Sequence, residues 1–170
     1  MDPQAIFDNF RTTVTDHYFD MNGRVGRAQF WYFVLAYAVC AIAAGILSAI
    51  TRLPLVGIFH LAMLLPSAGM GARRLQDTGR DGKLVWVLIF AAFVSQLVSV
   101  ITWLGALSMG WFGFLVFGPS FALLWLLNIA VFVAMVVLIY FWCQPGDPGS
   151  NGYGPPPPVF DPSKRVSPTA

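Results

Sequence analysis

The feature that most constrains this chain is a run of 60 residues without a charged side chain, from Leu84 to Cys143. A helix that crosses a hydrocarbon layer of about 30 Å needs about 20 apolar residues, so the run is too long for one crossing and sufficient for two or three. Over the whole chain only 11% of residues are charged, whereas a soluble domain carries about 25%. We therefore predict an all-α integral membrane protein.

Two further apolar segments precede this run, and each is long enough to cross a membrane. The first is expected from about Phe30 to Ile50 and the second from about Pro54 to Gly71. Small residues recur at every fourth position of the first segment, at Ala36, Cys40, Ala44 and Ser48. Small side chains at this spacing let another helix approach closely, so this face is expected to pack against protein rather than lipid.

Glycines and a proline divide the uncharged run near its middle, between Gly105 and Pro119. Because these residues interrupt helices, we predict spans at about 84–104 and 121–142 and thus four spans in total. The intervening residues 105–120 are expected on the outer side, where they either lie in the membrane interface or enter the membrane as a short helix buried by protein. A five-span alternative would place the C-terminal tail on the opposite side of the membrane.

The basic residues predict the orientation of the spans, because Lys and Arg in short loops remain in the cytoplasm. In the four-span arrangement only Arg52 lies on the outer side. The inner side then holds Arg11, Arg24, Arg27, Arg73, Arg74, Arg80, Lys83, Lys164 and Arg165. We therefore predict that both termini are cytoplasmic.

The two ends of the chain differ in character from the membrane domain, residues 23–143. Residues 1–22 are predicted to form an amphipathic helix, which lies on the membrane surface or packs on the protein's own loops. Its apolar stripe consists of Ile6, Phe7, Phe10, Val14 and Tyr18. The tail, residues 144–170, contains eight prolines. It is predicted to be disordered, because it has too little apolar surface to bury.

Composition and motifs exclude several classes of function. All eight acidic residues are Asp, and no zinc-protease, P-loop, nucleophile-elbow or dinucleotide-binding motif occurs. Cys40 and Cys143 lack CxxC spacing and are interpreted as packing residues. The net charge of +2 does not indicate a nucleic-acid partner. We therefore predict no enzymatic activity, no cofactor and no metal.

Three motifs in order resemble those of the domain of unknown function 805 family, the YhaH-like small bacterial inner-membrane proteins. They begin at Gly23 (GRVGRAQFW), at Arg73 (RRLQDTGR) and at Gly146, the last ending in Tyr-Gly-Pro at Pro155. The resemblance covers about residues 19–158 and implies a helical, multi-span protein of the bacterial cytoplasmic membrane, with no established reaction. This chain departs from the family pattern at Gln76, where His is usual, and at Asp81, where Ser is usual.

Charged residues gather where the spans are expected to end on the cytoplasmic side. We call this group the collar and define it by Arg24, Arg27, Arg73, Arg74, Asp77 and Arg80. One interpretation is a set of ion pairs that fastens the spans together, with Arg73 and Asp77 able to pair across one helical turn. The other is a binding site for an anionic lipid headgroup, because guanidinium groups match the geometry of phosphate.

Three polar side chains lie inside the predicted spans: His60, Gln96 and Asn128. If they met between helices, they would favour a small transporter or channel subunit. The spans hold no carboxylate, however, and polar residues of this kind usually hydrogen-bond neighbouring helices. The primary hypothesis is therefore a non-catalytic module that contacts membrane lipids, a second copy of itself or another membrane protein.

Overall fold

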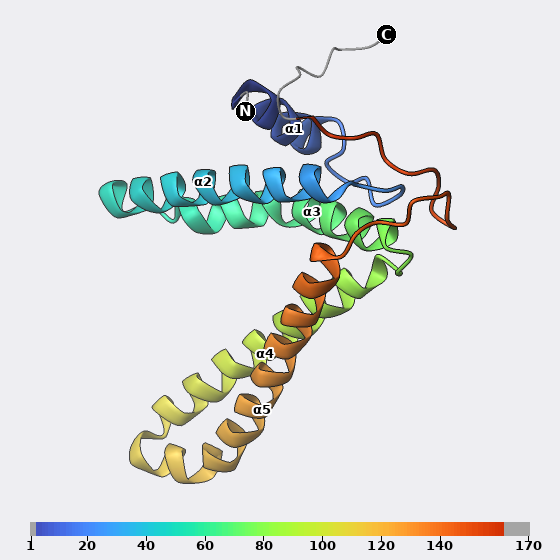
Figure 1. Ribbon diagram of the computed structural model, residues 1–170. Helices are drawn as coiled ribbons and strands as arrows, with labels where there is room; N and C mark the ends of the chain where they lie inside the picture. The colour runs from blue at the N-terminus through green and yellow to red at the C-terminus, as the bar shows by residue number, and fades with distance from the viewer. Residues whose placement is uncertain (1–2, 162–170) are drawn as a thin grey trace. The chain divides into compact units, whose positions relative to one another are not determined.

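The computed structural model describes residues 3–161, which form five helices (Figure 1). They are α1 (Pro3–Thr15), α2 (Arg27–Thr51), α3 (Leu55–Asp77), α4 (Lys83–Ser108) and α5 (Gly110–Cys143). Outside the helices, these residues form turns, irregular segments and one isolated β-bridge between Asn151 and Gly154. The predicted all-α fold is confirmed.

Four of the helices are long and apolar enough to cross a membrane. They are α2, α3, α4 and the part of α5 from Leu115 to Cys143. The most apolar 18-residue stretch of α3 has a mean hydropathy of 1.6, compared with 2.4 to 2.8 for the other three, so α3 is the least apolar of the four. The uncharged run therefore forms two helices, in agreement with the four-span prediction rather than the five-span alternative.

The described residues divide into two compact units. The first consists of residues 3–82 and 142–161 and contains α1, α2, α3 and the segment that follows α5. The second consists of residues 83–141 and contains α4 and almost all of α5. Every collar residue belongs to the first unit.

In the first unit α2 and α3 lie side by side and run in opposite directions (Figure 1). The chain turns between them at Arg52, whose left-handed backbone (φ 59°) lets its N–H close the last turn of α2 on the carbonyl of Ser48. The predicted small-residue face of α2 is half-buried, and Ser48 Oγ accepts a hydrogen bond from the N–H of Val56 at the start of α3 (2.8 Å). Leu35, by contrast, is 50% exposed on the opposite face.

Helix α1 packs on the protein itself, against the helices α2 and α3 rather than against its loops. Asn9 is buried and donates a hydrogen bond to the carbonyl of Gln29 (3.1 Å). Phe10, from the predicted apolar stripe, stacks on Phe33 of α2 with ring centroids 5.6 Å apart. Phe7, from the same stripe, is 63% exposed.

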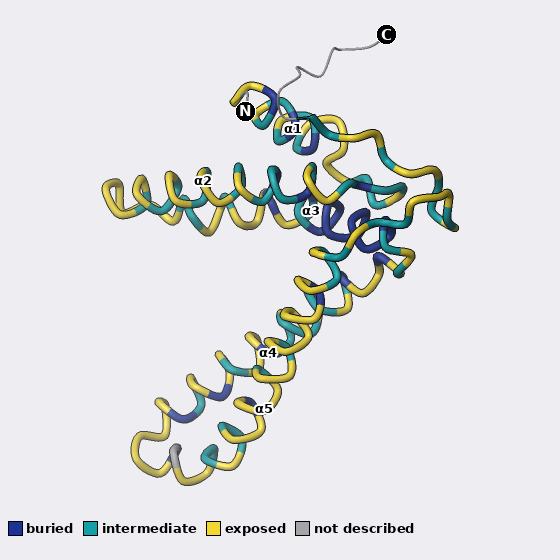
Figure 2. The backbone as a smooth tube through the Cα atoms, viewed as in Figure 1, coloured by how far each residue is buried: buried dark blue, intermediate teal, exposed yellow. Residues whose placement is uncertain are grey.

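Burial is concentrated at one end of the first unit, where every residue of α3 from Ala68 to Asp77 is buried (Figure 2). The adjoining apolar core consists of Val25, Phe30, Phe33, Met63 and Met70. Toward the opposite ends of α2 and α3, apolar side chains such as Ile50 and Ile58 are exposed, as expected of a surface that faces lipid. The first unit is therefore most deeply buried around the end of α3 that carries collar residues.

Residues 105–120 do not form the separate stretch between two helices that was predicted. Helix α4 continues to Ser108, the chain reverses at Met109 and Gly110, and α5 includes Gly118 and Pro119. Gly110 has a φ of 59°, a conformation that favours glycine, and a side chain on Gly113 would overlap the backbone of Ala106. These glycines therefore allow a tight turn and close helix contact instead of ending the helices.

The collar, a candidate functional site

The collar is built around the end of α3. Asp77 is the last residue of the helix, and Thr78 follows it as the C-cap. Gly79 adopts a left-handed conformation (φ 72°), and the N–H of Arg80 donates to the carbonyl of Leu75 (3.0 Å), which closes the helix in a Schellman motif. The Asp-Thr-Gly-Arg sequence therefore stops α3 with the Asp77 carboxylate held inside the first unit.

Asp77 receives two arginines, one on each carboxylate oxygen. Arg24 Nε donates to Oδ1 at 2.9 Å, and Arg74 Nη1 donates to Oδ2. The exposed fractions of the three side chains are 1% for Arg24, 0% for Arg74 and 4% for Asp77. Taking charges out of water is costly, so a cluster this deeply buried is stable only when its remaining donors also find partners.

The remaining N–H groups of these two arginines donate to backbone carbonyls. Arg24 contacts the carbonyls of Asp147, Gly149 and Gly154. Arg74 contacts those of Val25, Trp142 and Gln144. Because Trp142 and Gln144 lie at the end of α5, Arg74 also satisfies carbonyls that have no partner within a helix, where a cation is favoured.

The prediction that the tail is disordered is therefore wrong for its first part, residues 144–154. The N–H of Asp147 donates to the carbonyl of Asp77 (2.8 Å), and Asn151 Nδ2 donates to the carbonyl of Gln76 (2.9 Å). Gly146 lies so close to Asp77 that a side chain there would overlap the carboxylate. Polar backbone contacts, rather than apolar burial, fix this segment on α3. Residues 162–170, with Lys164 and Arg165, lie outside the described residues, as do residues 1 and 2.

The other predicted collar residues have different surroundings. Arg73 does not form the ion pair with Asp77 that its i, i+4 spacing predicted; instead its Nη1 lies 3.8 Å from Asp20 Oδ2. Arg80 Nη1 donates to the carbonyl of Thr78 (3.3 Å). Arg27 is exposed and donates to the carbonyl of Cys143 at 3.4 Å. The structure thus unites Arg24, Arg74 and Asp77 and leaves Arg27 at the surface.

Sequence reasoning missed the part of the collar supplied by the end of α5 and the tail. Trp142 Nε1 donates to the carbonyl of Gly71 (3.0 Å), and its ring lies 5.1 Å from that of Phe30. Asn151 orients the tail through Gln76 and through Asp147 Oδ2 (2.8 Å). The third motif contained the signal for this contact. Its Gly146 lies against Asp77, its Asn151 donates to Gln76, and the carbonyl of its Gly154 accepts from Arg24.

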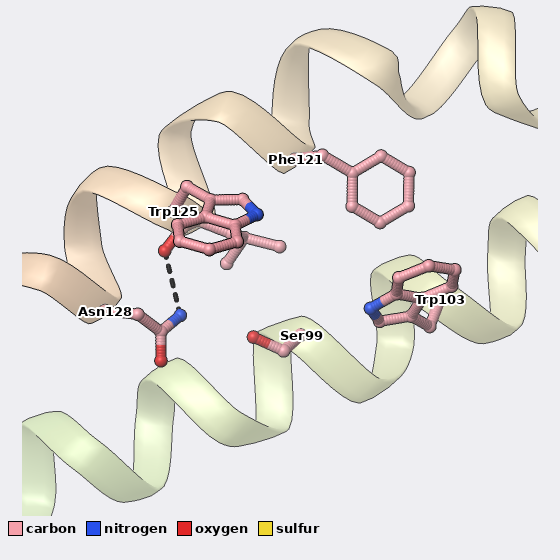
Figure 3. A pocket seen from close by; sticks show the side chains of 6 residues that line it. Ser99, Trp103, Phe121, Trp125 and Asn128 are labelled. Atoms are coloured by element: carbon pink, nitrogen blue, oxygen red, sulfur yellow. Dashed lines mark hydrogen bonds between the residues drawn. The ribbon is translucent and has the colours of Figure 1, made fainter.

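The polar residues inside the predicted spans are only partly brought together. In the second unit Gln96 Nε2 lies 3.5 Å from Asn128 Oδ1, and Asn128 Nδ2 donates to the carbonyl of Leu124 (2.8 Å). Asn128 and Ser99 also line a pocket of about 230 Å³, shown with its aromatic residues in Figure 3. His60 belongs to the first unit, where it stacks on Tyr37 with ring centroids 6.1 Å apart.

The buried charges of the collar are paired within the protein. Both Asp77 oxygens accept hydrogen bonds from arginines, so the carboxylate is occupied by the fold itself. Within residues 3–161, no group of three or more His, Cys, Asp or Glu side chains is placed to hold a metal ion. The arrangement links α3, the segment before α2 and the tail through one buried charge cluster.

We expect Asp77→Asn to destabilise the first unit strongly, because it leaves two buried arginines without a carboxylate. Breaking a buried pair in this way costs about 3–5 kcal/mol. The matched control is Asp8→Asn on α1, since Asp8 forms no ion pair among the described residues. Thermal unfolding in detergent, followed by circular dichroism, should show a lower Tm for the first variant alone. Equal Tm values for the two variants would contradict the fastening role.

We expect Gly146→Ala to loosen the tail from α3, because the added methyl group overlaps the Asp77 carboxylate. Overpacking of this kind costs about 1–3 kcal/mol. The measurement is amide hydrogen exchange of residues 144–154, which should become faster, most clearly at Asp147. Gly152→Ala is the control, because a side chain there meets open space. Unchanged exchange in the Gly146 variant would show that the close contact does not hold the tail.

Comparison with known proteins confirms the family resemblance of the three motifs. The family model described as "Protein of unknown function (DUF805)" matches residues 18–155, which include α2 to α5 and the ordered part of the tail. The proteins named "Inner membrane protein YhaI" from Escherichia coli strains K12 and O157:H7 are each 31% identical over 93 residues, 52% of this chain and 77% of theirs. No solved structure matches. The chain is therefore a helical membrane protein that belongs to the DUF805 family.

Proposed function

We propose that this protein is a non-catalytic module of the bacterial inner membrane that acts through contacts with lipids or with other membrane proteins. The location is supported by the name of its Escherichia coli relatives and by the four apolar helices. The excess of basic residues at the collar end supports cytoplasmic termini. A reporter that is active only in the cytoplasm, fused to the C-terminus, tests this orientation. An inactive reporter would place the C-terminus on the outer side of the membrane.

The observation that carries the proposal is an excess of positive charge in the collar. Arg24 and Arg74 share the single carboxylate of Asp77, and the charge of Arg27 lies near enough to act on Arg74. These three arginines and Asp77 carry a net charge of +2, which the Asp147 carboxylate in the adjoining segment lowers to +1. At the cytoplasmic surface such a charge attracts anionic lipids with about 1 kcal/mol per basic residue.

We expect the purified protein to retain anionic phospholipid in preference to zwitterionic phospholipid. The measurement is native mass spectrometry of protein released from nanodiscs that contain equal amounts of phosphatidylglycerol and phosphatidylcholine. Empty nanodiscs define the bulk ratio, and enrichment should fall at high salt because exposed charges are screened. Retention of the two lipids in the bulk ratio would remove the lipid-contact function.

Transport is the second candidate, and the pocket beside Asn128 favours it. The pocket is polar on the side of Ser99 and Asn128 and lies between α4 and α5 of the same unit. Its volume of about 230 Å³ is below the usual 300–1,000 Å³ of small-molecule sites. Solute flux into proteoliposomes that depends on Asn128, and disappears in Asn128→Leu, would replace the lipid-contact function by transport.

A further inference from the structure

Arg27 differs from the other arginines near Asp77 in being available to a ligand. Arg24 and Arg74 are buried and donate to Asp77 and to six backbone carbonyls, so neither can turn toward the membrane. Arg27 is exposed, and within residues 3–161 its guanidinium group makes one hydrogen bond, the 3.4 Å contact of Nη1 with the carbonyl of Cys143. A guanidinium group has five N–H donors, so most of its capacity remains unused.

A hollow of about 420 Å³ lies beside Arg27 on the surface of α2. Its walls are Arg27, Ala28, Trp31, Tyr32 and Leu35. Trp31 packs edge-on against Phe30, and Tyr32 lies 5.6 Å from the ring of Phe160, so neighbouring residues hold both aromatic walls in place. All five residues belong to α2, so the hollow is an open depression on the helix surface rather than an enclosed cavity.

The order of these side chains along α2 matches the order of the parts of a phospholipid. Arg27 begins the helix, Trp31 and Tyr32 follow one turn later, and Leu35 follows after another turn. This succession places a cation, then aromatic residues of the kind found at membrane interfaces, then an apolar side chain, over about 12 Å. A phospholipid presents a phosphate, a glycerol backbone and acyl chains in the same order.

The surrounding charge favours an anion at this place. Arg27 lies close enough to Arg74 for their like charges to interact unfavourably, while the nearby Asp77 carboxylate already binds two other arginines. Within the described residues Arg27 has no ion pair of its own. An incoming phosphate would relieve the repulsion and could accept two parallel hydrogen bonds from the guanidinium group.

We propose that Arg27, Trp31, Tyr32 and Leu35 form a binding site for the phosphate and upper acyl chain of an anionic phospholipid. This inference rests on the proposed lipid-contact function and assigns it to one site. Arg27 binds the phosphate, the aromatic residues flank the glycerol region, and Leu35 contacts the chain. The apolar end of the site distinguishes a lipid from free phosphate, which would use Arg27 alone.

The test compares three variants in nanodiscs of phosphatidylglycerol and phosphatidylcholine, with retained lipids counted by native mass spectrometry. Arg27→Gln should lower phosphatidylglycerol retention about fivefold, the effect of one basic residue. Ala28→Trp should lower it while keeping the charge, because the large side chain fills the hollow. Arg11→Gln, an exposed arginine on α1, is the control and should retain the lipid as the wild type does. Circular dichroism confirms that each variant is folded.

The outcomes separate the site from the general function. If the wild type is enriched in phosphatidylglycerol and Arg27→Gln is equally enriched, the site is overturned and the lipid-contact function stands. If the wild type shows no enrichment, both fail. Excess inorganic phosphate is added in a further arm: retention should persist, and complete displacement of the lipid would identify free phosphate as the ligand and overturn the lipid assignment.

Discussion

The first unit depends on the burial of Asp77 between Arg24 and Arg74. A carboxylate removed from water requires opposite charge, and two arginines removed from water require more acceptors than one carboxylate provides. The fold supplies these acceptors as backbone carbonyls from the segment before α2, the end of α5 and the tail. One buried anion therefore determines how four separate parts of the chain meet.

This arrangement explains why the three sequence motifs occur together. The first motif brings Arg24, the second brings Arg74 and Asp77 together with the glycine that ends α3, and the third brings the carbonyls and Gly146. None of the three can satisfy its polar groups alone, because each contains donors or acceptors whose partners lie in another motif. Because both oxygens of Asp77 bind Arg24 and Arg74, Arg27 stays outside the cluster and its guanidinium group remains exposed.

The second unit is held by different forces. Helices α4 and α5 contain no charged residue after Lys83, and their contacts are ring pairs, a weak amide contact and close backbone approach at Gly113. Interactions of this type suit a lipid environment, in which apolar burial provides no driving force between helices and close packing takes its place. The buried ion pairs of Asp77 with Arg24 and Arg74 belong to the first unit.

The sequence by itself determined that the chain is helical, that it crosses a membrane and that its charges gather where the spans end, because hydropathy and charge are local properties of each segment. It also indicated that Arg24, Arg74 and Asp77 belong to one region. Only the tertiary structure decided that Arg74 rather than Arg73 binds Asp77, that residues 144–154 are ordered and that residues 105–120 continue the helices. These outcomes depend on directions of side chains and on distant backbone carbonyls, and neither is encoded in the composition of a single segment.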